Sequence, residues 1–403
     1  MNYLFGGSRN NNRINKVFGA DTTRGNTLLA GWAPDAMKRV ISLTESDALN
    51  RNQAVVVFRG IQNGYTSFPS AVRSPMQMFE INNEEGAVTE KIDPFADFSD
   101  AEIDSYLVRL FGLYNEVDNG KRIIYQRYIS IIRRLLASEK KTIKPEKLFE
   151  YDVFNLLNLN ATARISEIER TNNERFLNSF IPDSRDLESY FYVFSHDKIG
   201  EILSGSRSIG DILGKKSALE ISLDFANKRK ESEMLMSVVV DCLYKTLNCW
   251  STDKDSVLVI ADDIPNEGLI RSDFEKLIKF GDKCRVIYTS SDVAGLIEKS
   301  SNNWIEYCDN FFFFVQNSNK NKEYCSKFFG EYDKRKESKS TSVNQPTFFD
   351  RLSGRGIVTR QTGKTVSYEK EAVYPTSVFS SLGPNEAIYY SKHTRKHGKY
   401  TVR

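Results

Sequence analysis

The hydrophobic positions follow two kinds of pattern, which divide the chain into three stretches. Near the N-terminus, residues 54–58 form an unbroken apolar run (AVVVF), typical of a strand buried on both faces of a parallel sheet. Between residues 97 and 197 the apolar positions recur at helical spacing, so that Ile103, Leu107 and Leu110 share one helix face. No strand pattern stands out in this middle stretch, which is predicted to be an all-helical insertion.

Strand and helix patterns alternate again from Ser217 onward. The strands are predicted at residues 219–223, 257–260, 285–288 and 311–315, and the helices between them at 229–247, 271–280 and 293–299. Such an order predicts a mostly parallel, doubly wound α/β sheet. The expected organisation is an α/β domain in two parts, residues 1–90 and 201–403, interrupted by an all-α domain at residues 91–200.

Two polar stretches follow the last of these elements. Residues 330–344 are rich in Lys and Ser and are predicted to form a flexible surface loop. The C-terminal residues 390–403 contain no acid and five cations: Lys392, Arg395, Lys396, Lys399 and Arg403. Either stretch could contact nucleic acid or an anionic surface, although solvated segments are the favoured interpretation.

Composition narrows the class of protein. A net charge of +3 over 403 residues is too small to indicate nucleic-acid binding by itself. The five cysteines are scattered and form no C-x-x-C pair, which favours reduced thiols and argues against a zinc site. No apolar run approaches the ~18 to 20 residues that span a bilayer. The expected location is the cytoplasm, or the inner face of a membrane if a partner recruits the chain.

The first candidate for chemistry is the strand at residues 257–260, which runs into the paired acids Asp262 and Asp263. In P-loop ATPases an aspartate at the carboxyl end of such a strand holds the Mg²⁺ shell, and a second carboxylate polarises the attacking water. The functional interpretation gives Asp262 the metal and Asp263 the water. A core strand that ends in a solvated acidic turn is an equally good interpretation of this segment alone.

The second candidate is a segment with the spacing A-x-x-x-x-G-K-T of a phosphate-binding loop, in which Asn26 takes the place of the lysine. Backbone N–H groups would cradle phosphates, Gly25 would permit the tight turn, and Thr27 would offer its hydroxyl to Mg²⁺. An ordinary turn rich in Thr, Gly and Asn is the favoured interpretation of this fragment by itself. The predicted nucleotide-binding residues are Ala20, Asp21, Thr22, Thr23, Arg24, Gly25, Asn26 and Thr27.

The order of the segments resembles the type IV secretion coupling proteins, the TraD/TraG-like conjugative ATPases. Residues 262–268 (DDIPNEG) resemble their DEFPN-x-G stretch, and residues 281–296 (GDKCRVIYTSSDVAGL) resemble their strand that ends in Gln-Ser. Residues 323–342 and 373–390 resemble their following helix and closing segment. The resemblance implies a RecA-like P-loop NTPase fold with an inserted all-α domain, use of ATP and Mg²⁺, assembly into a hexamer or with secretion subunits, and a DNA or protein substrate.

The sequence departs from this family at the positions that carry hydrolysis. Asn26 replaces lysine, Asp263 replaces a glutamate, and Ser290 replaces the glutamine that senses the γ-phosphate, with Ser291 beside it. The family's N-terminal transmembrane hairpin is absent, and Arg285 is the candidate for an arginine finger acting on a neighbouring copy, although a solvated arginine is favoured there.

Three hypotheses remain open from the sequence. The first is a weak ATPase or pseudo-ATPase of the coupling-protein kind. The second is a non-enzymatic structural or adaptor protein on a RecA-like scaffold, and the third is a DNA-translocating ATPase of the FtsK/HerA kind.

Overall fold

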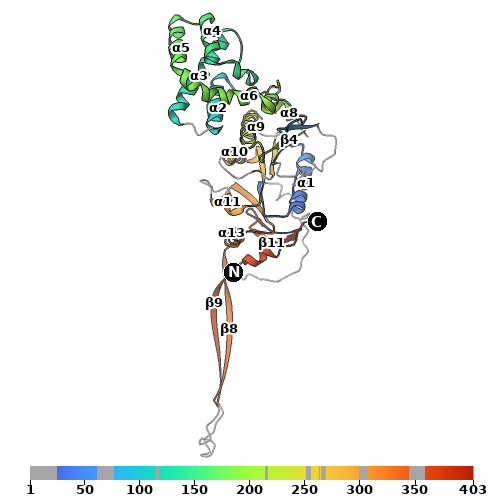
Figure 1. The fold of residues 1–403 in the computed structure, drawn as a ribbon. Helices are drawn as coiled ribbons and strands as arrows, with labels where there is room; N and C mark the ends of the chain where they lie inside the picture. Colours follow the sequence, from blue (N-terminus) through green and yellow to red (C-terminus); the bar gives the residue numbers. More distant parts are fainter. Residues whose placement is uncertain are drawn as a thin grey trace, which may run out of the picture.

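A nine-stranded, mostly parallel sheet forms the body of the molecule (Figure 1). The computed structural model describes residues 25–60, 77–114, 118–213, 217–250, 256–262, 264, 269–298, 307–344 and 359–402. The strand order is β11-β10-β7-β1-β6-β5-β2-β4-β3. All neighbours from β7 to β3 are parallel, whereas β10 pairs antiparallel with β7 and with β11.

The central strands are the apolar runs of the sequence. They are β1 (Asn26–Ala30), β2 (Ala54–Gly60), β4 (Ser217–Leu223), β5 (Val257–Asp262), β6 (Cys284–Ser290) and β7 (Cys308–Phe313). The strand β3 (Gln77–Asn82) lies at one edge, and β10 (Glu386–Ser391) and β11 (Lys396–Thr401) extend the other edge. The C-terminal basic segment therefore contributes strands to the sheet, which its charge pattern did not predict.

Helices cover both faces of the sheet, as the βαβα order predicts. On one face α1 (Pro34–Asn50) packs through Val40 and Ile41 against Val57 and Ile260. The opposite face carries α9 (Arg229–Cys249), most of which is buried, and α10 (Leu269–Ile278). Shorter elements complete this part: a 3-10 turn (Gly281–Lys283), α11 (Val293–Glu298), α13 (Asn319–Phe329) and α15 (Thr376–Ser380).

The predicted helical block lies between β3 and β4. It contains α2 (Asp100–Tyr114), α3 (Asn119–Ser138), α4 (Val153–Thr162), α5 (Glu167–Phe180), α6 (Ser184–Ser195), α7 (Asp197–Ile202) and α8 (Ile209–Ile212), with 3-10 turns at Pro145–Glu150 and Ile181–Asp183. Its core is aromatic, with Phe111, Tyr128 and Phe191 fully buried. In Figure 1 the block occupies one end of the molecule. The domain boundaries at residues 90 and 200 stay predictions.

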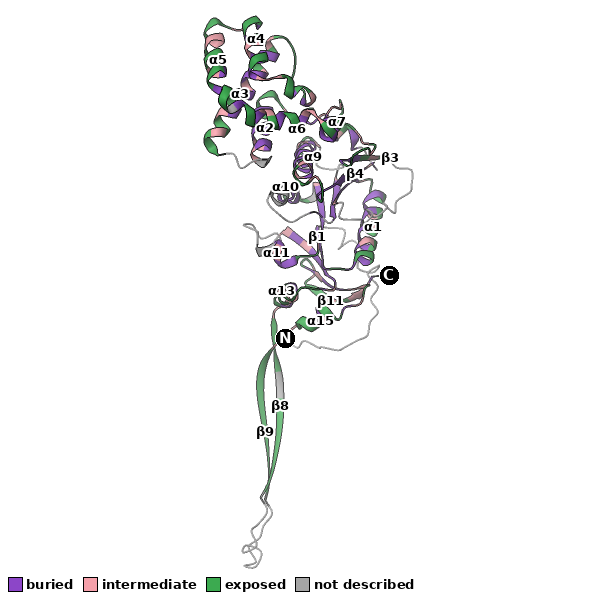
Figure 2. Ribbon diagram, in the orientation of Figure 1, coloured by how far each residue is buried: buried purple, intermediate pink, exposed green. Residues whose placement is uncertain are grey.

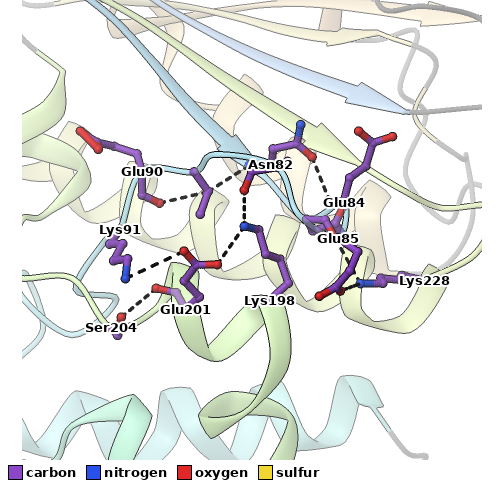
Figure 3. A network of polar contacts seen from close by, with 12 residues as sticks. Asn82, Glu84, Glu85, Glu90, Lys91, Lys198, Glu201, Ser204 and Lys228 are labelled. Atoms are coloured by element: carbon purple, nitrogen blue, oxygen red, sulfur yellow. Dashed lines mark hydrogen bonds and ion pairs between the residues drawn. The ribbon is translucent and has the colours of Figure 1, made fainter.

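A polar network fixes the start of this block to its end. The buried Lys198 of α7 donates hydrogen bonds to the Ala87 carbonyl and to Glu201, the latter at 2.8 Å. Lys91 lies 3.9 Å from Glu201, and Figure 3 shows these side chains converging on the segment that follows β3. Close by, the Ile92 N–H donates to the Ile202 carbonyl at 2.8 Å. The chain thus enters and leaves the block at one place.

The polar stretch predicted as a flexible loop is instead a strand. Residues Glu331–Asn344 form β8, which pairs antiparallel along its whole length with β9 (Thr359–Ala372). Figures 1 and 2 show this two-stranded arm projecting from the body at the end away from the helical block, with exposed residues along it. The prediction was wrong because Lys and Ser have a low intrinsic preference for strands. The segment becomes a strand because its backbone hydrogen-bonds to β9, which lies later in the chain.

Candidate functional site

The carboxyl ends of the central parallel strands are where open α/β sheets bind ligands. Five polar side chains gather there or beneath α1: Arg59 from β2, Glu220 from β4, Asp262 from β5, Thr289 from β6 and Glu45 from α1. Every one except Glu220 is classed among the buried residues. These residues form a buried polar cluster in the position expected for nucleotide chemistry.

Asp262, the predicted metal-side acid, is engaged within this cluster. Its carboxylate accepts a hydrogen bond from the Thr289 hydroxyl at 3.0 Å, and only 8% of the residue is exposed. Arg59 is its cross-strand partner in the register of β2 and β5. Asp263, the predicted water-side acid, lies outside the described residues.

Arg59 and Glu45 complete the cluster. Arg59 donates to Glu220 at 2.9 Å, and both side chains are largely shielded from solvent. Burial raises the pKa of Glu45 to about 7, an effect that Arg59 opposes and that the charges of Glu220 and Asp262 reinforce. The arrangement places one cation among three carboxyl groups, so that one of the acids holds a proton near neutral pH.

The turn between β1 and α1 is the position of the phosphate loop in a P-loop fold, and here it is very short. It consists of Gly31, Trp32 and Ala33, whereas a Walker A loop needs about eight residues. The Gly31 N–H donates to the Ser290 carbonyl at 2.8 Å, and the Trp32 N–H donates to the Val315 carbonyl at 2.9 Å. Pro34, the first residue of α1, has no N–H. The N–H groups of Gly31 and Trp32 are therefore bonded to neighbouring segments, and Pro34 has no N–H to offer a phosphate.

Gln316 fills the space beside this turn. It is 2% exposed, and its Nε2 donates to the carbonyls of Ala30 at 3.0 Å and Phe314 at 3.1 Å. Gly31 has φ +120°, and a Cβ built on it would lie 2.5 Å from that Nε2. Only glycine fits this position, which explains its presence without a role in phosphate binding.

The predicted phosphate-binding residues lie elsewhere. Ala20, Asp21, Thr22, Thr23 and Arg24 fall outside the described residues. Asn26 and Thr27 lie inside β1, and Thr27 is level with Ile287 of β6 and hence with Ile260, two residues before Asp262. Gly25 and Asn26 therefore lie nearer the amino ends of the strands. The prediction of a phosphate-binding turn over Gly25–Thr27 is wrong for these three residues.

Asn26 has a structural role in this position. Its Oδ1 accepts from the Val286 N–H of β6 at 2.8 Å, and its Nδ2 donates to the Tyr307 carbonyl at 3.1 Å. Its backbone N–H donates to Asp309 at 3.1 Å. The side chain thus joins the two strands that flank β1, and this requires an amide with both a donor and an acceptor.

The remaining predicted residues are divided between the two ends of β6. Ser290 and Ser291 lie at the carboxyl end, where the Ser290 hydroxyl accepts from the Asp292 N–H at 3.2 Å and the Ser291 carbonyl accepts from Asn321. Arg285 lies near the amino end, 7% exposed and hydrogen-bonded to Gln53, and burial lowers its pKa. Within this chain Arg285 is far along the strand from Asp262 and is covered, so the structure gives no support to an arginine finger.

The described residues show neither a cluster of metal ligands nor a membrane-spanning helix. No group of three or more His, Cys, Asp or Glu side chains is placed to hold a metal ion there. No described helix is both long enough and apolar enough to cross a membrane.

Comparison with solved structures nevertheless identifies the architecture. The bacterial conjugative coupling protein TrwBdeltaN70, in complex with sulphate, superposes with a TM-score of 0.61 at 12% identity, covering 95% of this chain and 85% of its own. This chain has the same RecA-like fold. TrwB in complex with ADP and Mg²⁺ gives a TM-score of 0.57 at 13% identity, covering 94% of this chain and 84% of its own. VirB4 of Thermoanaerobacter pseudethanolicus gives 0.55 at 9% identity, covering 96% and 91%.

These likenesses confirm the predicted RecA-like fold and the predicted resemblance to type IV secretion ATPases at the level of structure. No family model and no curated protein matches the sequence. Of the residues described here, the sequence interpretation named Asp262 but not Glu45, Arg59 or Gln316. The apolar run AVVVF that precedes Arg59 was a usable signal for a buried cation, whereas nothing local marks Glu45 or Gln316.

Proposed function

We propose that this chain is a pseudo-ATPase of the coupling-protein kind, a component of a type IV secretion or conjugation-type machinery that uses its RecA-like domain as a scaffold. The likeness in fold to TrwB and VirB4 supports the kind of machinery. The three-residue turn before α1 supports the pseudo-ATPase part of the proposal, because the N–H groups of Gly31 and Trp32 are bonded to β6 and to the segment after β7. Assembly with itself, as a hexamer, or with secretion subunits, and recruitment of a DNA or protein substrate, belong to this proposal.

The buried cluster supports the same conclusion. In an ATPase the aspartate at the end of this strand binds the Mg²⁺ shell. Here Asp262 accepts from Thr289 and neighbours Arg59, so a cation of the protein stands beside the carboxylate where Mg²⁺ would be needed. The charge that a metal would supply is already present in the fold.

The test is nucleotide binding and turnover by the purified full chain. We expect MgATP and MgADP at millimolar concentration to leave the thermal midpoint unchanged, since a ligand at 100 times its Kd would stabilise the fold by about 2.7 kcal/mol. We also expect no phosphate release, with or without DNA. Phosphate release that Asp262→Asn abolishes would overturn the proposal, and DNA stimulation of that release would favour the FtsK/HerA-like alternative.

A further inference from the structure

The arm formed by β8 and β9 has no core behind either face. Each strand is 14 residues long, and every side chain described between Glu331 and Val343 and between Arg360 and Lys370 is exposed. An isolated two-stranded hairpin is marginally stable in water. An arm of this length that projects from the body, as Figure 2 shows, is therefore a candidate for contact with another molecule.

Charge is segregated along the arm. The carboxylates all lie in the part nearer the body: Glu331, Asp333, Glu337, Glu369 and Glu371. Beyond Glu337, the described residues carry only positive charge, on Lys339, Arg360 and Lys364. We call this part, residues 338–343 and 360–365, the distal arm.

The strand register gathers the three cations on one face. Lys339 is directly opposite Lys364, and Arg360 is opposite Val343 on the same side of the ribbon, because residues an even number apart share a face. Like charges directly opposite each other destabilise a hairpin. Lys364 has Glu337 at 2.9 Å, but no carboxylate of the described residues pairs with Lys339 or Arg360. The charges of Lys339 and Arg360 are thus available to an external anion.

The opposite face of the distal arm is uncharged and polar. It presents Ser338, Ser340 and Ser342 on one strand, with Gln361 and Thr365 on the other. Hydroxyl, amide and cationic side chains are the groups that contact the phosphates and sugars of nucleic acids. Among the described distal residues only Val343 is a bulky apolar side chain, which disfavours insertion into a lipid surface.

We propose that the distal arm binds the phosphate backbone of duplex DNA through the face that carries Lys339, Arg360 and Lys364. A two-stranded ribbon has dimensions that the major groove of B-DNA admits, and ribbons are one of the elements that DNA-binding proteins use there. The contact is independent of base sequence. It rests on the proposed function for DNA as the substrate, and it assigns the contact to the arm, which is separate from the turn at Gly31 and from the buried cluster.

The experiment measures binding of the full chain to a fluorescent duplex of about 30 base pairs by anisotropy, in the absence of nucleotide, across a series of salt concentrations. The distal double variant Lys339→Gln/Arg360→Gln is compared with the base variant Lys334→Gln/Lys370→Gln, which removes the same charge from the same arm near the body. The distal variant is expected to bind at least about fivefold more weakly, and its slope of log K against log salt is expected to be shallower by about 1.8. The base variant should change affinity less than about twofold.

The charge-conserving variant Lys339→Arg/Arg360→Lys should bind like the unaltered chain, and thermal midpoints should show that all variants fold. Absence of DNA binding at low salt would overturn the proposal, as would equal losses in the distal and base variants. Binding to phosphatidylserine vesicles that depends on the same cations, without binding to DNA, would assign the arm to a membrane instead. None of these outcomes depends on whether the RecA-like domain hydrolyses ATP.

Discussion

Asn26 shows how a motif match can be satisfied by a different physical role. The spacing around Gly25, Asn26 and Thr27 fits a phosphate loop, yet Asn26 joins β6 to the segment before β7 with one donor and one acceptor. Gly25 has φ +95°, and a Cβ there would lie 2.0 Å from the Asp309 carboxylate. Gly25 and Asn26 are thus explained by strand packing.

Asn26→Lys distinguishes the two roles. We expect the substitution to lower the free energy of unfolding by about 2 kcal/mol or more, because it leaves the Val286 N–H and the Tyr307 carbonyl without their buried partner. Nucleotide affinity measured by calorimetry should not rise. Asn158→Lys on the exposed surface of α4 is the control and should be close to neutral. A gain in MgATP affinity in the Asn26 variant would restore the phosphate-loop interpretation.

Glu45 should make stability depend on pH. Burial raises the pKa of this carboxyl from its ordinary value of 4.5 to about 7 in the folded chain. The folded state therefore retains a proton that the unfolded state releases, so the stability present below about pH 4.5 is lost as pH rises toward 7. Glu45→Gln removes this loss. The free energy of unfolding of the variant minus that of the unaltered chain, measured with urea, should rise by up to about 3 kcal/mol from pH 5 to pH 8.

The exposed Glu84→Gln serves as the matched control for Glu45, and it should shift stability equally at both pH values. An identical difference at pH 5 and pH 8 for Glu45→Gln would show that the carboxyl is not the source of the pH dependence.

At the scale of elements, short connections decide what the fold can do. The turn between β1 and α1 is hydrogen-bonded to β6 through Gly31 and to the segment after β7 through Trp32, and Pro34 follows it directly. The connection from β3 into the helical block is held in part by Lys198, which donates to the Ala87 carbonyl and to Glu201. Both connections were invisible in the apolar pattern, since they contain few hydrophobic residues.

Lys198→Gln tests the second connection. We expect a loss of about 1 to 3 kcal/mol of unfolding free energy and faster hydrogen exchange over residues 82–91, since the Ala87 carbonyl loses a buried charged donor. Lys91 is the other lysine near Glu201; its side chain is 51% exposed, and its Nζ lies 3.9 Å from the Glu201 carboxylate. Lys91→Gln should therefore lower the free energy of unfolding by less than about 1 kcal/mol. Equal effects of the two substitutions would show that burial of Lys198 does not matter.

At the scale of the whole molecule, the nine-stranded sheet has the same fold as the structures that it resembles. The helical block and the arm lie at opposite ends of the body, as Figure 1 shows, with the buried cluster in the sheet between them. A fold can retain its strand order after losing a ligand site, because the strands are held by apolar packing on both faces and not by the ligand. The scaffold and the arm remain available for binding other macromolecules.

The sequence alone determined the secondary structure of the core and the class of fold. Runs such as AVVVF and VLVI are typical of buried strands in a parallel sheet, and the helical periodicity of the middle block is a local property of the chain. The tertiary structure decided which residues meet. Gln316 reaches the turn at Gly31 across 285 positions of sequence, Glu45 joins Asp262 from another element, and β8 becomes a strand only because β9 pairs with it. Such contacts depend on register and on the crossing of distant segments, and no local pattern carries that information.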